Sequence, residues 1–193
     1  AATEHNRQTL LAEGVSDESI IVTGNPVVDA LLHILKRPRQ QSALDDLLQA
    51  THNRRRIVLT THRRESLGPT MRDNLAVLRR FVEARDDVTL IFPVHPKPSV
   101  VSSAQQILQN SGKIHLTDPL GYEDFIHLLS RSWLIVSDSG GVQEEAPTLG
   151  KPVLILRENT ERPEAVEAGV ARLVGGDPRR LEEMLAQIDD DPS

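Results

Sequence analysis

A short run of residues near position 140 has the composition of a phosphate-binding turn. The run Asp138-Ser139-Gly140-Gly141 directly follows an apolar stretch ending at Ser137, and the segment after it has a helical pattern. Glycines let the backbone approach a ligand closely, and the free N–H groups of a helix start favour negative charge. We expect Ser139 to cap this helix and a phosphate to bind at its start. An ordinary tight strand-to-helix turn is the alternative, because short glycine motifs are weakly specific.

Two acids and a proline follow in the same predicted helix. Glu144 and Glu145 lie near its start, where carboxylates stabilise the positive end of the helix dipole. Pro147, further along, removes one helical hydrogen bond. Helix stability alone does not require this combination, so the acids serve either the dipole or a ligand.

Polar clusters also follow three other apolar runs, and imidazole and guanidinium groups in such positions can reach a diphosphate. The clusters are His62-Arg63-Arg64-Glu65, His95 and Lys97 between three prolines, and Thr160-Glu161-Arg162 before Pro163. Each has a structural alternative. The arginines can pair with Glu65, Glu161 or Glu164, and the prolines can simply fix a rigid turn.

These clusters need a parallel sheet to bring them together. Six short runs rich in Val, Ile and Leu predict strands that are covered on both faces. They are Ile57–Thr61, Val88–Val94, Ile114–Thr117, Trp133–Ser137, Pro152–Leu156 and Ala171–Val174. Helical patterns separate them at about 70–84, 98–110, 121–131, 140–149, 161–168 and 178–189. Right-handed crossovers then predict an α/β fold, a doubly wound, Rossmann-like parallel sheet whose ligand lies outside the carboxyl ends of the strands.

The first 55 residues are more polar and carry three helical patterns. Thr3–Glu13 reads as a helix closed by Gly14, Asn25-Pro26 opens a second helix over Val27–Leu35, and a short third helix is expected around Ser42–Ala50. Two arginine-rich runs, Lys36–Arg39 and Arg54–Arg56, form either a phosphate patch or a solvated linker.

Composition narrows the function classes. The net charge is −6, which argues against a nucleic-acid-binding protein, because such proteins need clustered Lys and Arg. No apolar run approaches the roughly 18 residues of a membrane span. The seven histidines show no pairing at metal-ligand spacing. We expect neither a metal nor a cofactor. The chain has no cysteine and no signal-like N-terminus, which fits a cytoplasmic protein.

Taken in order, the clusters resemble the non-hydrolysing UDP-N-acetylglucosamine 2-epimerases of bacteria. The resemblance covers roughly residues 3–188 and rests on six groups of motifs at compatible spacing. They are Thr23-Gly24-Asn25-Pro26 with Val28-Asp29-Ala30-Leu31, His62-Arg63-Arg64-Glu65, Pro93-Val94-His95-Pro96, Asp138-Ser139-Gly140-Gly141 with Gln143-Glu144-Glu145-Ala146-Pro147, Gly150-Lys151-Pro152-Val153, and Thr160-Glu161-Arg162-Pro163-Glu164.

The resemblance implies two Rossmann-like domains in a GT-B-like arrangement, of which this chain supplies the C-terminal one. Residues 1–22 would then be the end of a missing N-terminal domain, 23–56 a crossover helix and connector, and 57–193 the UDP-binding domain. The parent would be a cytoplasmic homodimer that interconverts UDP-GlcNAc and UDP-ManNAc through 2-acetamidoglucal and UDP, in cell-envelope polysaccharide biosynthesis.

It also implies roles for individual residues. Ser139, Gly140 and Gly141 would hold phosphate, His62 and Arg162 would bind the diphosphate that leaves during catalysis, and Glu145 would accept hydrogen bonds from the ribose. The region of Phe125 would flank uracil. His95 with Arg63 and Arg64 matches positions implicated in a second, activating UDP-GlcNAc.

The chain lacks the preceding domain of that family, with its acidic residues for the C2 proton, and a C-terminal helix that crosses back. We therefore expect the parent to be an epimerase and this chain alone to be inactive. A hydrolysing 2-epimerase, a GT-B glycosyltransferase and a stand-alone nucleotide-binding module remain alternatives, because each would use a similar nucleotide half.

Overall fold

The computed structural model describes residues 1–63 and 68–190. Contacts within the chain divide it into two compact units, Ala1–Arg37 and Pro38–Ser193. The boundaries at 22/23 and 56/57 stay predictions about a longer parent protein.

The first unit contains two helices, α1 (Glu4–Ala12) and α2 (Pro26–Lys36), and the short 3-10 helix η1 (Asp17–Ser19). The Thr3 side chain caps α1, and the Asn25 side chain caps α2 by accepting the N–H of Val27 at 3.1 Å. Both helices were predicted, the second from its Asn25 cap, and both predictions are confirmed.

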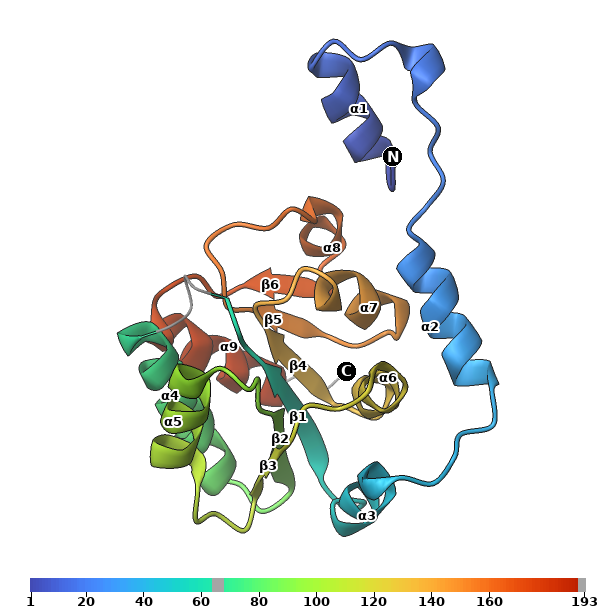
Figure 1. Ribbon diagram of the computed structural model, residues 1–193. Coiled ribbons are helices and arrows are strands. Elements are labelled where there is room, and N and C mark those ends of the chain that lie inside the picture. Colours follow the sequence, from blue (N-terminus) through green and yellow to red (C-terminus); the bar gives the residue numbers. More distant parts are fainter. Residues whose placement is uncertain (64–67, 191–193) are drawn as a thin grey trace. The chain divides into compact units, whose positions relative to one another are not determined.

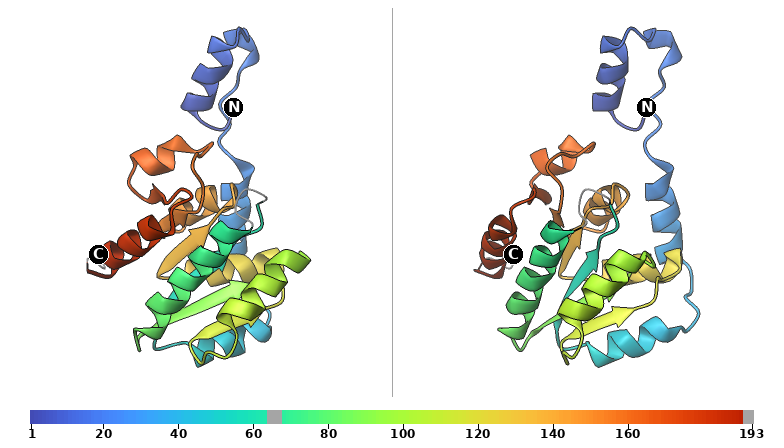
Figure 2. Two further views of the ribbon diagram at one scale, coloured as in Figure 1. Left: turned by 90° about the vertical axis from the view of Figure 1, so that its left-hand side faces the viewer. Right: turned by 60° about the vertical axis from the view of Figure 1, so that its left-hand side comes forward.

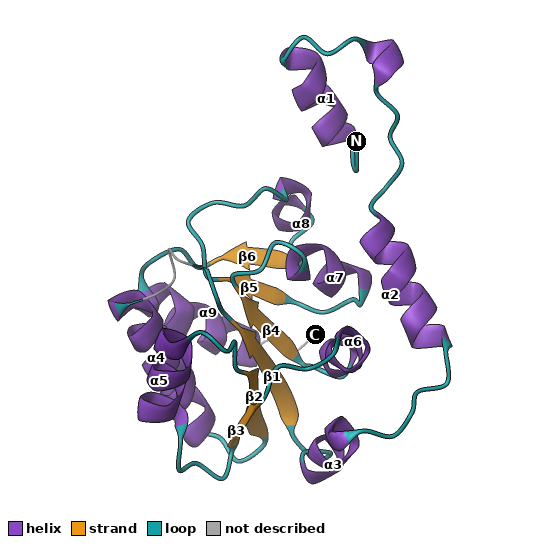
Figure 3. Ribbon diagram, viewed as in Figure 1, coloured by secondary structure: helices purple, strands orange, loops and turns teal. Residues whose placement is uncertain are grey.

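The second unit is built on a six-stranded parallel sheet with the order β3-β2-β1-β4-β5-β6 (Figures 1 and 3). The strands are β1 (Arg55–Thr60), β2 (Val88–Pro93), β3 (Ile114–Thr117), β4 (Leu134–Ser137), β5 (Val153–Ile155) and β6 (Ala171–Leu173). Every predicted apolar run overlaps one of these strands, although β1 begins at Arg55, two residues before its run. The doubly wound parallel fold is confirmed.

Helices cover both faces of this sheet. They are α3 (Ala43–Ala50), α4 (Pro69–Glu83), α5 (Pro98–Leu108), α6 (Tyr122–Ser130), α7 (Val142–Thr148), α8 (Pro163–Glu167) and α9 (Pro178–Asp190). Helices α4, α5 and α9 lie on one face, and α6 and α7 lie on the other (Figures 1 and 2). Each helix was predicted, with ends that differ by at most two residues.

One apolar core cluster lies between the sheet and helices α4, α5 and α9. Helix α4 buries Met71, Leu75, Leu78 and Val82, a spacing of three to four residues that puts them on one face. They pack with strand residues in one cluster that also includes Leu185 of α9. Burial of this apolar stripe holds the strands in register, and so it fixes the ends of the loops that leave the sheet.

The sheet has a switch point between its two central strands. Strand β1 pairs with β2 on one side and with β4 on the other, with Thr60 aligned with Ser137. Chain segments leave these neighbouring strands toward opposite faces of the sheet. In open α/β sheets such a point is where ligands bind. The loops after Thr60 and Ser137 therefore begin side by side.

Three arginines of the arginine-rich runs form contacts within the folded chain. Arg55 binds Asp87 and Asp189 at 2.7 and 2.8 Å, and its guanidinium lies 4.3 Å from the centre of the Trp133 ring. Arg56 donates to the Thr51 hydroxyl at 2.8 Å. In Lys36–Arg39, Arg39 pairs with Asp45 of α3 and Asp124 of α6. Arg55 and Arg56 brace the amino end of the sheet and Arg39 braces the α3 connection, so a solvated linker does not describe these three residues.

Candidate functional site

A fully buried carboxylate joins the ends of β1 and β4. Asp138 is 0% exposed. It accepts hydrogen bonds from the Thr61 hydroxyl at 2.8 Å and from the backbone N–H groups of His62 and Arg63 at 3.0 and 2.9 Å. Because the acceptor belongs to the β4 loop and the donors to the β1 loop, Asp138 fixes one loop against the other. Sequence reasoning gave Asp138 no role of its own, although an acid directly after a buried strand was a usable signal.

His62 and His95 stack on each other above this carboxylate. Their ring centres are 5.5 Å apart and their planes differ by 14°. The Nδ1 of His62 lies 3.4 Å from Asp138, whereas the Nδ1 of His95 accepts the N–H of Lys97 at 3.2 Å. The proline-rich turn after β2 thus positions His95 next to His62. Arg64, the third member of this predicted group, lies outside the described residues.

The glycine loop, Asp138-Ser139-Gly140-Gly141, differs from the prediction in one respect. Ser139 does not cap α7, because the N-cap residue is Gly141 and no side chain caps the helix. The Ser139 N–H instead donates to the Ser137 hydroxyl at 2.9 Å, and the Ser139 carbonyl accepts from the buried Gln143 amide at 3.2 Å. Within residues 1–63 and 68–190, no acceptor is assigned to the N–H groups of Gly140 and Gly141. Both groups are therefore available to a ligand.

Arg63 lies beside the same loop. A Cβ atom added to Gly140 would be 3.6 Å from the Nη2 of Arg63 and 4.0 Å from a carboxylate oxygen of Glu161. The β1 loop and the β5–α8 loop thus both reach Gly140.

The β5–α8 loop is tied to α7 by side chains. The Thr160 hydroxyl donates to the Gln143 side chain, and the Arg162 guanidinium pairs with Glu144. The Glu161 carboxylate pairs instead with Arg157 through two hydrogen bonds of 2.9 and 3.0 Å. Arg162 therefore contacts a carboxylate on α7 that the sequence did not indicate. Gln143 and Thr160 are further residues that sequence reasoning left without a role.

Glu145 is buried, with 5% of its surface exposed. It accepts a hydrogen bond from the Tyr122 hydroxyl at 2.9 Å. Burial raises the pKa of the Glu145 carboxyl, the hydrogen bond from Tyr122 lowers it, and the nearby Glu144 charge raises it, with a net upward shift. An exposed partner of the helix dipole would not be placed in this way, so that alternative does not fit Glu145.

Phe125 is half-buried on α6, one turn after Tyr122. This spacing puts the two aromatic residues on neighbouring parts of one helical face. Tyr122 itself was not predicted as a site residue, although its separation of three residues from Phe125 was visible in the sequence.

Residues 1–63 and 68–190 contain no group of three or more His, Asp or Glu side chains that could hold a metal ion. No helix within those ranges has the length and apolar character of a membrane span.

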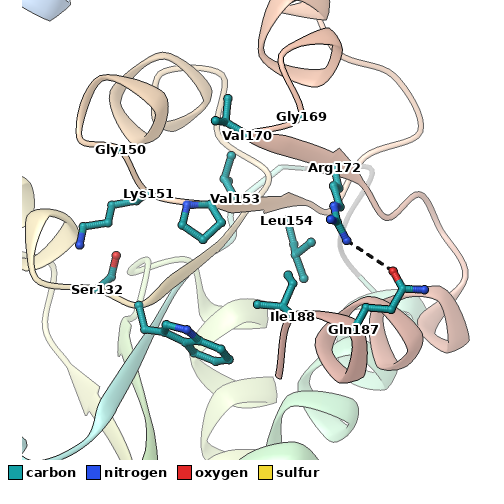
Figure 4. A pocket seen from close by; sticks show the side chains of 12 residues that line it. Ser132, Gly150, Lys151, Val153, Leu154, Gly169, Val170, Arg172, Gln187 and Ile188 are labelled. Carbon is teal, nitrogen blue, oxygen red and sulfur yellow. Dashed lines mark hydrogen bonds between the residues drawn. The ribbon is translucent and has the colours of Figure 1, made fainter. Parts of the chain in front are cut away.

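A hollow of about 690 Å³ lies at the opposite, amino end of the sheet. Trp133, Lys151, Arg172 and Ile188 are among its lining residues (Figure 4). Arg172 turns toward Gln187, to which it donates a hydrogen bond of 3.4 Å. None of the predicted site residues is in this lining.

Comparison with known proteins decides the family. The model of the UDP-N-acetylglucosamine 2-epimerase family matches residues 1–193. The chain belongs to this family. A probable UDP-N-acetylglucosamine 2-epimerase of Ralstonia nicotianae is 47% identical over 180 residues, which are 91% of this chain and 48% of that protein.

Solved structures of the epimerase family share the fold. The UDP-GlcNAc 2-epimerase of Neisseria meningitidis bound to UDP-GlcNAc is 38% identical, with a TM-score of 0.92 over 100% of this chain and 53% of that one. The S. aureus MnaA–UDP co-structure is 37% identical, with a TM-score of 0.92 over 99% of this chain and 51% of that one.

The chain thus spans about half the length of the epimerases it matches, and it corresponds to their C-terminal half. The α/β unit built on its parallel sheet is one of the two domains of a GT-B-like fold.

Proposed function

We propose that this chain is the UDP-binding half of a UDP-GlcNAc 2-epimerase. The observation that carries the proposal is the meeting of three loops at the switch point of the sheet, around the open N–H groups of Gly140 and Gly141. Family structures with UDP and with UDP-GlcNAc support a nucleotide-sugar ligand. A cytoplasmic, homodimeric parent active in cell-envelope polysaccharide biosynthesis is part of the same proposal and rests on the resemblance.

The diphosphate would bind at the glycine loop. Gly140 and Gly141 would donate backbone N–H groups, with Ser139 beside them, while Arg162 and His62 approach from the other two loops. Guanidinium groups are suited to phosphate because they offer several donors in a fixed plane. Arg162 is paired with Glu144 in the structure, so binding would exchange this carboxylate for a phosphate oxygen.

The nucleoside would extend from the glycine loop toward α6. Glu145 lies one turn into α7 and would accept hydrogen bonds from the ribose hydroxyls, while Phe125 would flank the uracil. A buried carboxylate with one assigned donor has acceptor capacity to spare, because an ionised carboxyl group offers about four lone-pair sites. This spare capacity supports the ribose assignment.

In the parent, the C2 proton would be removed while the C1–O bond to UDP breaks, which gives 2-acetamidoglucal and UDP. Addition of UDP to C1, with a proton delivered to the other face of C2, would then give the epimer. His62 would contact the diphosphate as it leaves, oriented by Asp138. The carboxylates for the C2 proton would come from the missing N-terminal domain, so this chain alone would be inactive.

His95 and Arg63 would contact a second, activating UDP-GlcNAc, together with Arg64. The stacking of His95 on His62 supports a second ligand close to the first. Arg63 lies near both Gly140 and Glu161, so its guanidinium also has the diphosphate within reach.

Calorimetric titration of the chain with UDP, uridine and 2′-deoxy-UDP tests the proposal. UDP should bind more tightly than uridine. Glu145→Ala should weaken UDP binding by roughly tenfold or more, since it removes charged hydrogen bonds of about 1.5–3 kcal/mol. Glu182→Ala, which removes an exposed carboxylate on α9, is the matched control and should leave affinity unchanged.

The ribose assignment has its own check. The unmutated chain should bind 2′-deoxy-UDP poorly, and Glu145→Ala should cost little further affinity for that ligand. Equal affinity for UDP and uridine, or unchanged UDP affinity in folded Glu145→Ala, would contradict the proposal. NMR analysis of UDP-GlcNAc incubated with the chain should show no epimer above a His62→Ala control.

A further inference from the structure

The contact between Tyr122 and Glu145 links two helices that the proposed nucleoside would touch. Tyr122 is the first residue of α6, and Glu145 lies on α7. The phenol donates to Oε1 of Glu145 at 2.9 Å. Tyr122 is 43% exposed while Glu145 is 5% exposed. The hydroxyl therefore reaches inward from a ring that remains at the surface.

This hydrogen bond restrains the carboxylate without saturating it. A carboxylate on a flexible side chain has several rotamers, and one short contact to a phenol selects among them. Oε2 and one lone pair of Oε1 remain for further donors. Two vicinal hydroxyl groups need two acceptor sites held in one plane, which a restrained carboxylate supplies.

We propose that Tyr122 is a positioning residue, whose hydroxyl orients the Glu145 carboxylate to accept both ribose hydroxyls of a uridine nucleotide. The inference rests on the proposed function, because it requires the ribose to lie at Glu145. Tyr122 would act through Glu145 and not through the diphosphate.

Helix α6 does not depend on this hydrogen bond for its place. It buries Ile126, Leu128 and Leu129, and its Asp124 accepts from Arg39 at 2.8 Å and from Ser42 at 3.0 Å. Removing the Tyr122 hydroxyl should therefore leave α6 docked. The change isolates the orientation of Glu145 from the fold.

The charges around Glu145 give the proposal a second readout. Tyr122 faces the carboxylate from α6, and Glu144, itself paired with Arg162 from the α8 side, is adjacent on α7. Burial, together with the hydrogen bond to Glu145, raises the pKa of Tyr122 to about 12, so the phenol stays a donor at neutral pH. Since this donor lowers the pKa of Glu145, its loss should move that pKa further up.

The main experiment compares Tyr122→Phe with the unmutated chain in calorimetric UDP titrations from pH 5 to 8, with Ser130→Ala as a matched hydroxyl deletion on α6. Tyr122→Phe should weaken UDP binding roughly three- to tenfold. Its affinity should also fall on acidification at a higher pH than in the unmutated chain, because protonated Glu145 accepts fewer hydrogen bonds. Ser130→Ala should change neither quantity, and the Tyr122→Phe penalty should shrink for 2′-deoxy-UDP.

A ligand-free measurement checks the contact itself. Tyr122 is the single tyrosine of the chain, so the phenolate absorbance band reports its ionisation alone. Glu145→Gln should lower the pH at which this band grows, because the neutral amide no longer stabilises the protonated phenol. An unchanged titration would overturn the assigned hydrogen bond.

The outcomes separate the two proposals. If the unmutated chain binds no UDP, the proposed function fails and this inference fails with it. If UDP binds and Glu145→Ala weakens it, yet folded Tyr122→Phe keeps the affinity and pH profile of the unmutated chain, only the role of Tyr122 is overturned. Circular dichroism of each variant establishes that it is folded.

Discussion

The two ends of the parallel sheet use carboxylates in different ways. At the carboxyl end, Asp138 is fully buried and accepts from a hydroxyl and two backbone N–H groups. At the amino end, Asp189 is 19% exposed and accepts from the guanidinium groups of Arg55 and Arg85. Backbone donors cannot move away from their acceptor without moving the loop, whereas arginine side chains can. The first arrangement fixes loop geometry, and the second braces strand and helix ends.

The amino-end hollow and the candidate site lie at opposite ends of the sheet. The hollow of about 690 Å³ lies at the amino end, while the loops that converge with open N–H groups lie at the carboxyl end. Under the proposed function, the nucleotide would bind at the carboxyl end and not in this hollow. Converging polar groups held by a buried anchor are the better guide in this fold.

The largest expected effect comes from removing the buried anchor. Asp138→Ala leaves the buried Thr61 hydroxyl and two partly buried N–H groups without their acceptor. A buried donor without a partner costs about 1–3 kcal/mol and a partly buried one less, so the free energy of unfolding should fall by about 2 kcal/mol or more. Asp189→Ala at the amino end should cost about 1 kcal/mol or less, because its partners can turn to solvent. Urea denaturation of both variants measures the difference. Equal losses would contradict the contrast between the two ends. If Asp138→Ala does not fold, Asp138→Asn provides the comparison.

A smaller effect on stability should follow from removing the hydrogen bonds that hold the β5–α8 loop. Gln143 is 1% exposed and links the Ser139 carbonyl to Thr160. Gln143→Leu keeps the volume but breaks both links, so stability should fall by about 1–2 kcal/mol and UDP affinity by several-fold. Gln106→Leu, an exposed change on α5, is the matched control. Retained UDP affinity in folded Gln143→Leu would show that the loop holds its place without this tie.

Glu145→Gln should stabilise the chain while it weakens UDP binding. A carboxyl whose folded pKa is raised above its ordinary value of 4.5 contributes its full stability only below that value. This contribution is lost as pH rises through the folded pKa. The neutral amide avoids the loss, so the melting temperature of Glu145→Gln should exceed that of the unmutated chain at pH 7.

The two melting temperatures should converge below pH ~4.5, where both side chains are neutral. Differential scanning calorimetry across this range is the measurement. A constant difference at all pH values would mean that burial of the charge is not its cause.

The smallest effect is expected in the amino-end hollow. Lys151→Ala and Arg172→Ala alter its lining and should leave UDP affinity within about twofold, a difference below 0.5 kcal/mol. Calorimetric titration checks this. A larger loss of affinity in either variant would indicate that the nucleotide binds at the amino end of the sheet, which would contradict our proposal.

The sequence by itself determined the fold and allowed the candidate site residues to be grouped. Continuous apolar runs such as Val88–Val94 predict strands buried on both faces, and their alternation with helical segments predicts a parallel sheet. In a parallel sheet, residues that follow strands meet at one edge, which is why His62, Gly140 and Arg162 could be grouped before any contact was known. Strands and helices depend on residues that are close in sequence, so hydrophobic periodicity predicts them well.

Only the tertiary structure decided which partner each polar side chain has. Arg162 pairs with Glu144 and not with the Glu161 carboxylate, Glu145 takes a donor from Tyr122, 23 residues away in the chain, and Asp138 anchors a loop 75 to 77 residues before it. Such contacts depend on strand order and on loop paths of a few ångströms, and neither leaves a periodic trace in the sequence. Apolar burial is nonspecific and can be read from composition along the chain, whereas hydrogen bonds are directional and exist only once the strands are in register.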